Sequence, residues 1–260
     1  MKYLRTKIGE NWEIRYLGLN FHIQEVDTSL EQTMKGIRGV TFDFGGTLAQ
    51  GELDKNRFTD RLLVYLRSLG FSGREAQLRQ ARNGMLERLM RARARNREIR
   101  LEDLYQGVLF EIGIHPEPDV IDHIHQLYIG SFEVELVPGV GEVLEFLSAE
   151  YRLAVVSNAI SDVPRYALKR FDLEKYLNTV TISRDIGIRK PDPEIFRFTL
   201  ANLAIESNKA IHVGDSLEDD IQGARNVGMR TIWIANSDEE ISIQPDYTIY
   251  SLAELTSLLR

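Results

Sequence analysis

The sequence predicts a doubly wound α/β fold, with a parallel sheet covered by helices on both faces and interrupted by one all-helical insertion. From residue 37 onward, short β-forming runs alternate with helical patterns, which is typical of such a sheet. The β-forming runs are apolar almost throughout, as expected of strands that are buried on both faces. Residues 53–136 alone interrupt the alternation, and they contain only amphipathic helical patterns.

The strands and helices of the sheet domain can be placed from these patterns. The predicted strands are 38–44, 151–157, 179–183, 210–214, 230–235 and 246–250. The predicted helices between and after them are 139–149, 161–170, 192–205, 217–227 and 251–259. Pro193 suits the first turn of one helix, and Gly228 is positioned to end another.

The insertion is predicted to form its own helical domain. Four helices are expected, at 55–69, 74–97, 101–112 and 117–130, and no strand is expected between residues 53 and 136. A βαβ crossover needs only about a dozen residues, so an insertion of about 80 residues must have a separate role. Because it follows the first strand, it would cover the carboxyl end of the strands, where open α/β sheets bind ligands.

Three parts therefore follow from the sequence. The core domain is predicted to comprise residues 37–52 and 137–260, and the helical insertion residues 53–136. The N-terminal extension, residues 1–36, does not continue the alternation of strands and helices. Its segment NWEIRYLGLNFHIQEV, residues 11–26, alternates partially and predicts a hairpin, which we expect to cover an edge of the sheet.

Composition excludes several classes of protein. Apolar residues make up 43% of the chain and charged residues 27%, which is ordinary for a globular protein. The net charge of −7 argues against a nucleic-acid partner, and no run approaches the ~18 apolar residues of a membrane span. The first residues lack the apolar stretch of a signal peptide, so we expect a cytoplasmic protein with no membrane partner. The chain has no cysteine, which excludes disulfides and thiolate chemistry.

Polar residues gather at the carboxyl ends of the predicted strands, or just after them. They form the elements Asp43-Phe-Gly-Gly-Thr47, Ser157-Asn158, Lys190-Pro-Asp-Pro and Gly214-Asp215-Ser-Leu-Glu-Asp219-Asp220. Each element alone has an ordinary explanation, such as a turn, a solvated lysine, or acids that favour a helix N-terminus. Together they bring a nucleophilic carboxylate, a hydroxyl, a cation and an acidic cluster to one edge of one sheet.

In this order the four elements resemble the motifs of the haloacid dehalogenase (HAD) superfamily. The resemblance covers the core, residues 37–52 and 137–260, and the insertion resembles that superfamily's helical C1-type cap. It implies a Rossmann-like core and a hydrolase in which Asp43 attacks a phosphoryl group and becomes an aspartyl-phosphate. It further implies that Mg²⁺ is held by Asp43, the backbone carbonyl of Gly45 and Asp215. Asp220 would hold the waters of the ion, and Asp219 is a second candidate for that role.

The resemblance also implies roles for the remaining polar residues. Ser157, in the second motif with Asn158, would donate a hydrogen bond to a phosphoryl oxygen, and Thr47 would orient the first loop. Lys190 would neutralise the charge of the carboxylate and the phosphate together. Bringing two like charges to ~4 Å costs about 4 kcal/mol at an effective dielectric constant near 20. A divalent cation and a lysine are the compensation that such an attack needs.

Gly45 departs from the pattern of the family. Phosphatases of the superfamily usually carry a second Asp at this position, which protonates the leaving oxygen, and such acid–base catalysis is typically worth ~10²–10⁴-fold. Three consequences are open. The substrate has a good leaving group, such as an acyl phosphate; or His115, His123, His125 or a Glu within 98–111 supplies the proton; or the phosphoenzyme turns over slowly.

The expected function is a Mg²⁺-dependent phosphohydrolase acting on a small phosphorylated metabolite. A 2-haloacid dehalogenase also lacks the second acid, but it loses the carboxylate that Asp215 provides here. A phosphonate hydrolase needs a lysine in the cap, and the insertion has only Lys55, at its edge. The remaining alternative is a non-catalytic relative that binds a phosphate ligand or a partner protein.

The insertion also contains an arginine-rich run, RARARNREIR at residues 91–100. A charge run of this kind usually forms a solvated helix face. The alternative is a guanidinium clamp for a second anionic group of the substrate, because the arginine fork suits carboxylates and phosphates.

Overall fold

The computed structural model describes residues 4–8, 11–16, 19–23, 36–235 and 243–259. The chain divides into two compact units, Met1–Ile37 and Arg38–Arg260, which are described separately. The first unit contains three antiparallel strands, β1 (Leu4–Ile8), β2 (Asn11–Tyr16) and β3 (Leu19–Ile23). The hairpin expected within residues 11–26 is therefore present, and β1 adds a third strand to it. Its position over a sheet edge stays a prediction.

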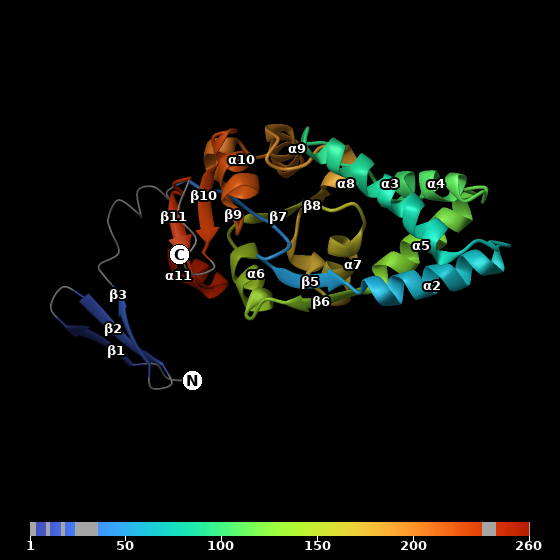
Figure 1. Cartoon of the computed structure of the whole chain (residues 1–260). Helices are drawn as coiled ribbons and strands as arrows, with labels where there is room; N and C mark the ends of the chain where they lie inside the picture. Colours follow the sequence, from blue (N-terminus) through green and yellow to red (C-terminus); the bar gives the residue numbers. More distant parts are fainter. Residues whose placement is uncertain (1–3, 9–10, 17–18, 24–35, 236–242, 260) are drawn as a thin grey trace. The chain divides into compact units, whose positions relative to one another are not determined.

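The second unit is built on a six-stranded parallel sheet (Figure 1). The strand order is β11-β10-β9-β4-β7-β8, and every neighbouring pair is parallel. The strands are β4 (Gly39–Phe42), β7 (Arg152–Ser157), β8 (Thr179–Ile182), β9 (Ala210–Gly214), β10 (Arg230–Ile234) and β11 (Tyr247–Ile249). All residues of β4 and β9 are buried, as the apolar runs predicted. The predicted fold class is confirmed.

Helices connect these strands, and all of them except a short helix at Ser183–Ile186, which the sequence did not predict, lie within or close to the predicted ranges. They are α6 (Val140–Ser148), α7 (Val163–Arg170), α8 (Ser183–Ile186), α9 (Pro193–Leu203), α10 (Gly223–Arg225) and α11 (Leu255–Leu258). Short 3₁₀ turns are η1 (Glu174–Tyr176), η2 (Ser207–Lys209) and η4 (Leu252–Glu254). The helix predicted at 217–227 instead begins as the π-helical segment η3 (Leu217–Gln222) and continues as α10. Among the described helices, none is long and apolar enough to cross a membrane.

The insertion contains the four helices that the sequence predicted. They are α2 (Lys55–Ser68), α3 (Glu75–Arg93), α4 (Leu101–Glu111) and α5 (Pro118–Ile129). These helices pack around a hydrophobic core of their own, in which Phe58, Leu62 and Tyr105 are almost fully buried. Figure 1 shows them gathered together beyond one end of the sheet region.

A two-stranded antiparallel ribbon joins the helices to the sheet domain. It pairs β5 (Ala49–Leu53) with β6 (Phe132–Leu136), and Figure 1 shows both strands leading towards α2. The expectation of no strand between residues 53 and 136 was therefore wrong. The sequence of β6, Phe-Glu-Val-Glu-Leu, does alternate, but one short strand next to a helical region is a weak signal, and its pairing partner lies about 80 residues earlier.

The strand order places the polar elements close together. β4 lies between β9 and β7 in the sheet, and the strands are parallel, so their carboxyl ends share one edge. Asp43 follows β4, Ser157 ends β7, and Asp215 follows β9. The edge of the sheet therefore brings Asp43 together with residues that follow it by more than 100 positions in the sequence.

Candidate active site

A cavity of about 580 Å³ opens at this edge, between the sheet and the inserted helices. The sheet side is lined by Asp43, Gly45, Ser157, Asn158, Lys190, Asp215, Asp219 and Asp220. The opposite wall is lined by Leu86, Leu89, Arg93, Tyr128 and Phe132. All of the predicted site residues except Thr47 thus line one cavity.

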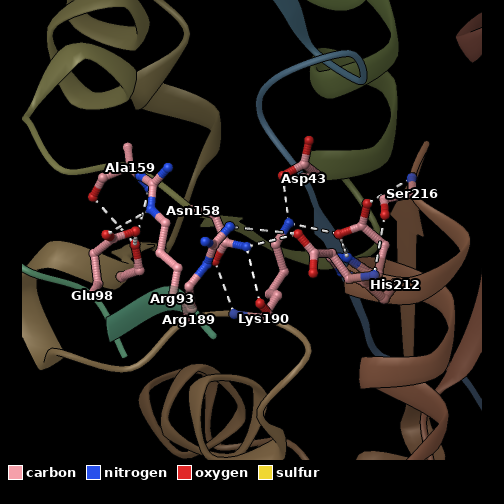
Figure 2. Close-up of polar contacts among 12 residues, drawn as sticks. Asp43, Arg93, Glu98, Asn158, Ala159, Arg189, Lys190, His212 and Ser216 are labelled. Atoms are coloured by element: carbon pink, nitrogen blue, oxygen red, sulfur yellow. Dashed lines mark hydrogen bonds and ion pairs between the residues drawn. The ribbon is translucent and has the colours of Figure 1, made fainter. Parts of the chain in front are cut away.

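Lys190 lies at the centre of the polar contacts (Figure 2). Its Nζ donates one hydrogen bond to Asp43 Oδ1 and another to Asp220 Oδ1, the latter at 2.6 Å. The Lys190 side chain is only 2% exposed, that of Asp220 1%, and that of Asp43 10%. A lysine this deeply buried is stable only beside opposite charge, and two carboxylates provide it.

The three groups shift the pKa of one another. Burial raises the pKa of Asp43 to about 7, although the charge of Lys190 opposes this shift. Burial alone would lower the pKa of Lys190, but Asp220 and Asp43 together raise it. Burial likewise acts against ionised Asp220, yet Lys190 and the hydrogen bond from His212 hold the pKa of Asp220 well below its usual range. Lys190 is therefore cationic and Asp220 anionic at neutral pH.

Three carboxylates in the cavity are close enough to share a cation. One oxygen each from Asp43, Asp215 and Asp220 can be chosen so that all three lie within 4.8 Å of one another. Glycines allow this approach, because a Cβ at Gly46 would collide with the Asp215 carboxylate and one at Gly214 with Asp220. A set of carboxylate oxygens at this spacing fits a hard divalent cation such as Mg²⁺.

Asn158 organises the segment that contains Lys190. Its amide group donates to the Lys190 carbonyl at 3.1 Å and accepts from the Lys190 backbone N–H at 2.9 Å. The same amide nitrogen donates to Asp219 at 3.0 Å, and Arg189 lies 3.8 Å from that carboxylate. The contacts of Asp219 are thus with Asn158 and Arg189, and it does not share the three-carboxylate cluster of Asp43, Asp215 and Asp220.

Thr47 is fully buried and does not line the cavity. Its hydroxyl has no hydrogen-bond partner among the described residues. Backbone hydrogen bonds hold the first loop instead, since Leu48 and Ala49 both donate to the Phe44 carbonyl. No hydrogen bond of the Thr47 hydroxyl to a described residue therefore supports its expected role in orienting the first loop.

The three cap histidines lie elsewhere. His125 Nδ1 lies 3.0 Å from Glu102, the His123 ring is 4.0 Å from the Tyr65 ring, and His115 Nδ1 lies 3.1 Å from Glu117. None of them is among the described residues that line the cavity. The acids within 98–111 are also absent from that lining.

The arginine-rich run divides into two kinds of residue. Arg91 is an exposed partner of Glu87, and Arg100 pairs with Asp103, as a solvated face predicts. Arg93 alone in this run lines the cavity. Its Nε lies 3.3 Å from Glu98, whose side chain is completely buried. Tyr128 shares that wall, and burial raises the pKa of its hydroxyl to about 12.

Ionic contacts also connect the insertion with the core. Arg184 donates to Glu102 of α4 and to Asp162 of the core. His125 of α5 accepts a hydrogen bond from the Asp162 backbone N–H at 3.3 Å. Burial acts to raise the pKa of Glu102, but the hydrogen bond with His125 and the charge of Arg184 lower it to about 2.

Sequence reasoning missed His212 and Arg189. His212 is a single polar residue within the buried run of β9, and this is the only signal that could have identified it. Arg189 directly precedes Lys190 in the third motif, and its position at the cavity depends on the fold of the loop after α8.

Comparisons with known proteins agree with this geometry. Residues 40–234 match the family described as haloacid dehalogenase-like hydrolase. A glyceraldehyde 3-phosphate phosphatase of Pyrococcus furiosus is 34% identical over 129 residues, which cover 47% of this chain and 54% of the relative. A ribulose-1,5-bisphosphate 5-phosphatase of Halopiger xanaduensis is 33% identical over 49% of this chain and 58% of the relative. The matches thus span about half the length of these curated relatives.

Solved structures resemble a larger part of the chain. A 2-haloacid dehalogenase from Pseudomonas syringae is 26% identical with a TM-score of 0.62, covering 86% of this chain and 98% of that one. A HAD phosphatase from Thermococcus onnurineus has the same coverage, 24% identity and a TM-score of 0.55. The second likeness concerns the fold alone.

Proposed function

Because the chain belongs to the haloacid dehalogenase-like hydrolase family, we propose that it is a phosphohydrolase that acts on a small phosphorylated metabolite. The observation that carries this proposal is the contact of buried Lys190 with Asp43 and Asp220 inside the cavity. Relatives named as phosphatases of glyceraldehyde 3-phosphate and ribulose bisphosphate support the substrate class.

In the first step, a carboxylate oxygen of Asp43 forms a bond with the phosphorus atom while the bond from phosphorus to the leaving oxygen breaks. Burial favours the neutral form of Asp43, and the charge of Lys190 opposes this by stabilising the ionised carboxylate. Lys190 also offsets the repulsion between carboxylate and phosphate, which is about 4 kcal/mol per charge pair at ~4 Å. Ser157 donates a hydrogen bond to a phosphoryl oxygen. In the second step, a water oxygen forms a bond with the same phosphorus while the bond from phosphorus to the Asp43 oxygen breaks. Asp43 is released as a carboxylate, and both hydrogens of the water leave with the phosphate.

We further propose a Mg²⁺ site formed by Asp43, Asp215, Asp220 and the carbonyl of Gly45. The oxygen donor set supports the choice of ion. When bound, the ion would neutralise charge on the phosphoryl oxygens. We assign Asp219 a structural role, in which its contacts with Asn158 and Arg189 stabilise the wall of the cavity.

Gly45 determines which substrates suit the site. A Cβ built on Gly45 would meet no atom within 4 Å, so the place that an acid would occupy is open space. The cap histidines lie away from the cavity, which favours a substrate with a good leaving group or a slow enzyme over a proton donated by the cap. An acyl phosphate meets the first description, since its carboxylate leaves without protonation.

Hydrolysis of p-nitrophenyl phosphate tests this function. We expect release of nitrophenolate with Mg²⁺, with loss of activity in EDTA and in Asp43→Asn. Phosphate binding without turnover would instead support a non-catalytic relative and would overturn the hydrolase proposal.

A second candidate is 2-haloacid dehalogenation, which the similarity to a dehalogenase structure at 26% identity favours. There, Asp43 would attack the carbon that bears the halogen, and halide would leave without a proton. Halide release from a 2-haloacid in EDTA, with no hydrolysis of aryl phosphate, would select this reaction.

A further inference from the structure

A buried histidine contacts Asp220 of the carboxylate cluster, and Figure 2 shows this histidine, His212, close to Lys190. His212, on β9, is 0% exposed. Its Nε2 lies 3.0 Å from Asp220 Oδ1, and its Nδ1 lies 2.8 Å from the hydroxyl of Thr41 on the neighbouring strand β4. The ring also packs edge-on against Phe196, with centroids 5.0 Å apart. Its orientation is therefore fixed by two polar contacts and one aromatic contact.

The partners of His212 determine which nitrogen carries a hydrogen. Asp220 Oδ1 already accepts a hydrogen bond from Lys190, and an ionised carboxylate can only accept. Nε2 must therefore be the donor, and this holds whether the ring is neutral or protonated. In the neutral ring, Nδ1 carries no hydrogen and accepts from the Thr41 hydroxyl, whose other acceptor within reach is the Ile211 carbonyl at 3.3 Å. Asp220 therefore selects the tautomer, and Thr41 complements it, because a hydroxyl can either donate or accept.

Three donors together hold the Asp220 carboxylate. Lys190 and His212 share Oδ1, while the backbone N–H of Ser216 donates to Oδ2 at 3.0 Å. Lys190 also donates a hydrogen bond to Asp43, so its ammonium group is shared between two carboxylates. Without His212, Lys190 would be the only side-chain donor at Oδ1, and Asp220 could turn further towards it.

We propose that His212 is a positioning residue, whose Nε2–H holds Asp220 in the orientation that serves the divalent-cation site and leaves Lys190 available to Asp43. This inference rests on the proposed cation site. Partners that hydrogen-bond to metal-ligating groups typically contribute about 10- to 100-fold to metal affinity. His212 is assigned a contribution of this size.

Two matched variants separate the two ring nitrogens. The amide nitrogen of glutamine in His212→Gln can take the place of Nε2, whereas that of asparagine in His212→Asn lies near Nδ1. Both side chains are neutral and polar, so their burial costs are comparable. Mg²⁺ affinity can be followed without turnover through Trp233, whose indole donates to the Asp215 carbonyl at 2.8 Å, with Trp12→Phe removing the second tryptophan.

We expect His212→Gln to bind Mg²⁺ within about threefold of the wild type and His212→Asn to bind about 10- to 100-fold more weakly. Thr41→Val keeps Nε2 but removes the partner of Nδ1, so it should weaken Mg²⁺ binding by less than His212→Asn does. If His212→Asn does not fold, Thr41→Val still tests the hydrogen bonds that run from Thr41 through His212 to Asp220. Thermal unfolding in EDTA should be similar for the Gln and Asn variants.

The outcomes are distinct. Equal Mg²⁺ affinity in the wild type and His212→Asn, or equal losses in the Gln and Asn variants, would overturn the positioning role. A wild-type protein whose fluorescence and binding heat do not respond to Mg²⁺ would overturn the proposed cation site itself.

Discussion

Lys190 and Asp43 are 147 positions apart in the sequence, yet Lys190 Nζ donates a buried hydrogen bond to Asp43 Oδ1. The same ammonium group contacts Asp220 at 2.6 Å, so one cation serves two buried carboxylates. Removing it would leave both without their shared partner, and this consequence can be measured.

Lys190→Met should lower both activity and stability. Loss of a preorganised donor typically costs about 10²–10³-fold in kcat, and breaking a buried ion pair costs about 3–5 kcal/mol in the free energy of unfolding. Aryl phosphate kinetics and denaturant unfolding measure the two effects. Lys175→Met, at an exposed lysine whose ion-pair partner is Asp172, is the control. Wild-type stability in Lys190→Met would contradict the buried ion pair.

Gly45→Asp should restore an acid to the site, because the side chain has open space to occupy. Hydrolysis of an alkyl phosphate, which needs a protonated leaving group, should rise about 10²-fold or more, while p-nitrophenyl phosphate should change little. Gly45→Asn has the same size without an ionisable group and should give no acceleration. Equal acceleration by both variants would show that proton donation is not the cause.

Arg93→Gln should affect substrates with a second anionic group. Loss of a charged hydrogen bond of about 1.5–3 kcal/mol lowers kcat/KM about 10- to 100-fold. We expect this loss for 4-carboxyphenyl phosphate and little change for phenyl phosphate. Arg91→Gln is the matched control, since Arg91 is exposed on the same helix. A similar loss for both substrates would mean that Arg93 acts only by pairing with buried Glu98.

Glu102→Gln should change how stability depends on pH. The folded protein lowers the pKa of Glu102 from 4.5 to about 2, so the ionised group stabilises the fold above pH 4.5. That contribution is lost as pH falls from 4.5 towards 2. The difference in unfolding free energy between wild type and variant should therefore be largest near neutral pH and shrink in acid. An exposed control, Glu87→Gln, should give a small difference at every pH, and a constant difference for Glu102→Gln would contradict the contact with Arg184 and His125.

The sequence was sufficient for the features that depend on local pattern. Apolar runs identified the strands of the parallel sheet, and the motif residues Asp43, Ser157 and Asp215 could be placed because each stands at a strand end. Parallel strands bring such ends to one edge whatever the intervening chain does. The four inserted helices were equally clear from their periodicity.

Features that depend on partners distant in the sequence could not be found in this way. β6 is defined by pairing with β5, and the role of His212 by contacts with Thr41 and Asp220. Arg93 looked like its neighbours in the run, and only the fold, which brings Arg93 to the cavity, separates it from Arg91. Likewise, the sequence could not show that the cap histidines do not line the cavity, because this depends on which faces of the inserted helices point towards it.

The central claim is that Asp43 becomes phosphorylated during turnover. Acid quench during steady-state hydrolysis of p-nitrophenyl phosphate, followed by peptide mass spectrometry, tests it most directly. The account predicts a phosphoryl group on the peptide that contains Asp43, present with Mg²⁺ and absent in Asp43→Asn. Hydrolysis that proceeds at full rate with phosphate on no aspartate, or undiminished hydrolysis by Asp43→Asn, would contradict it.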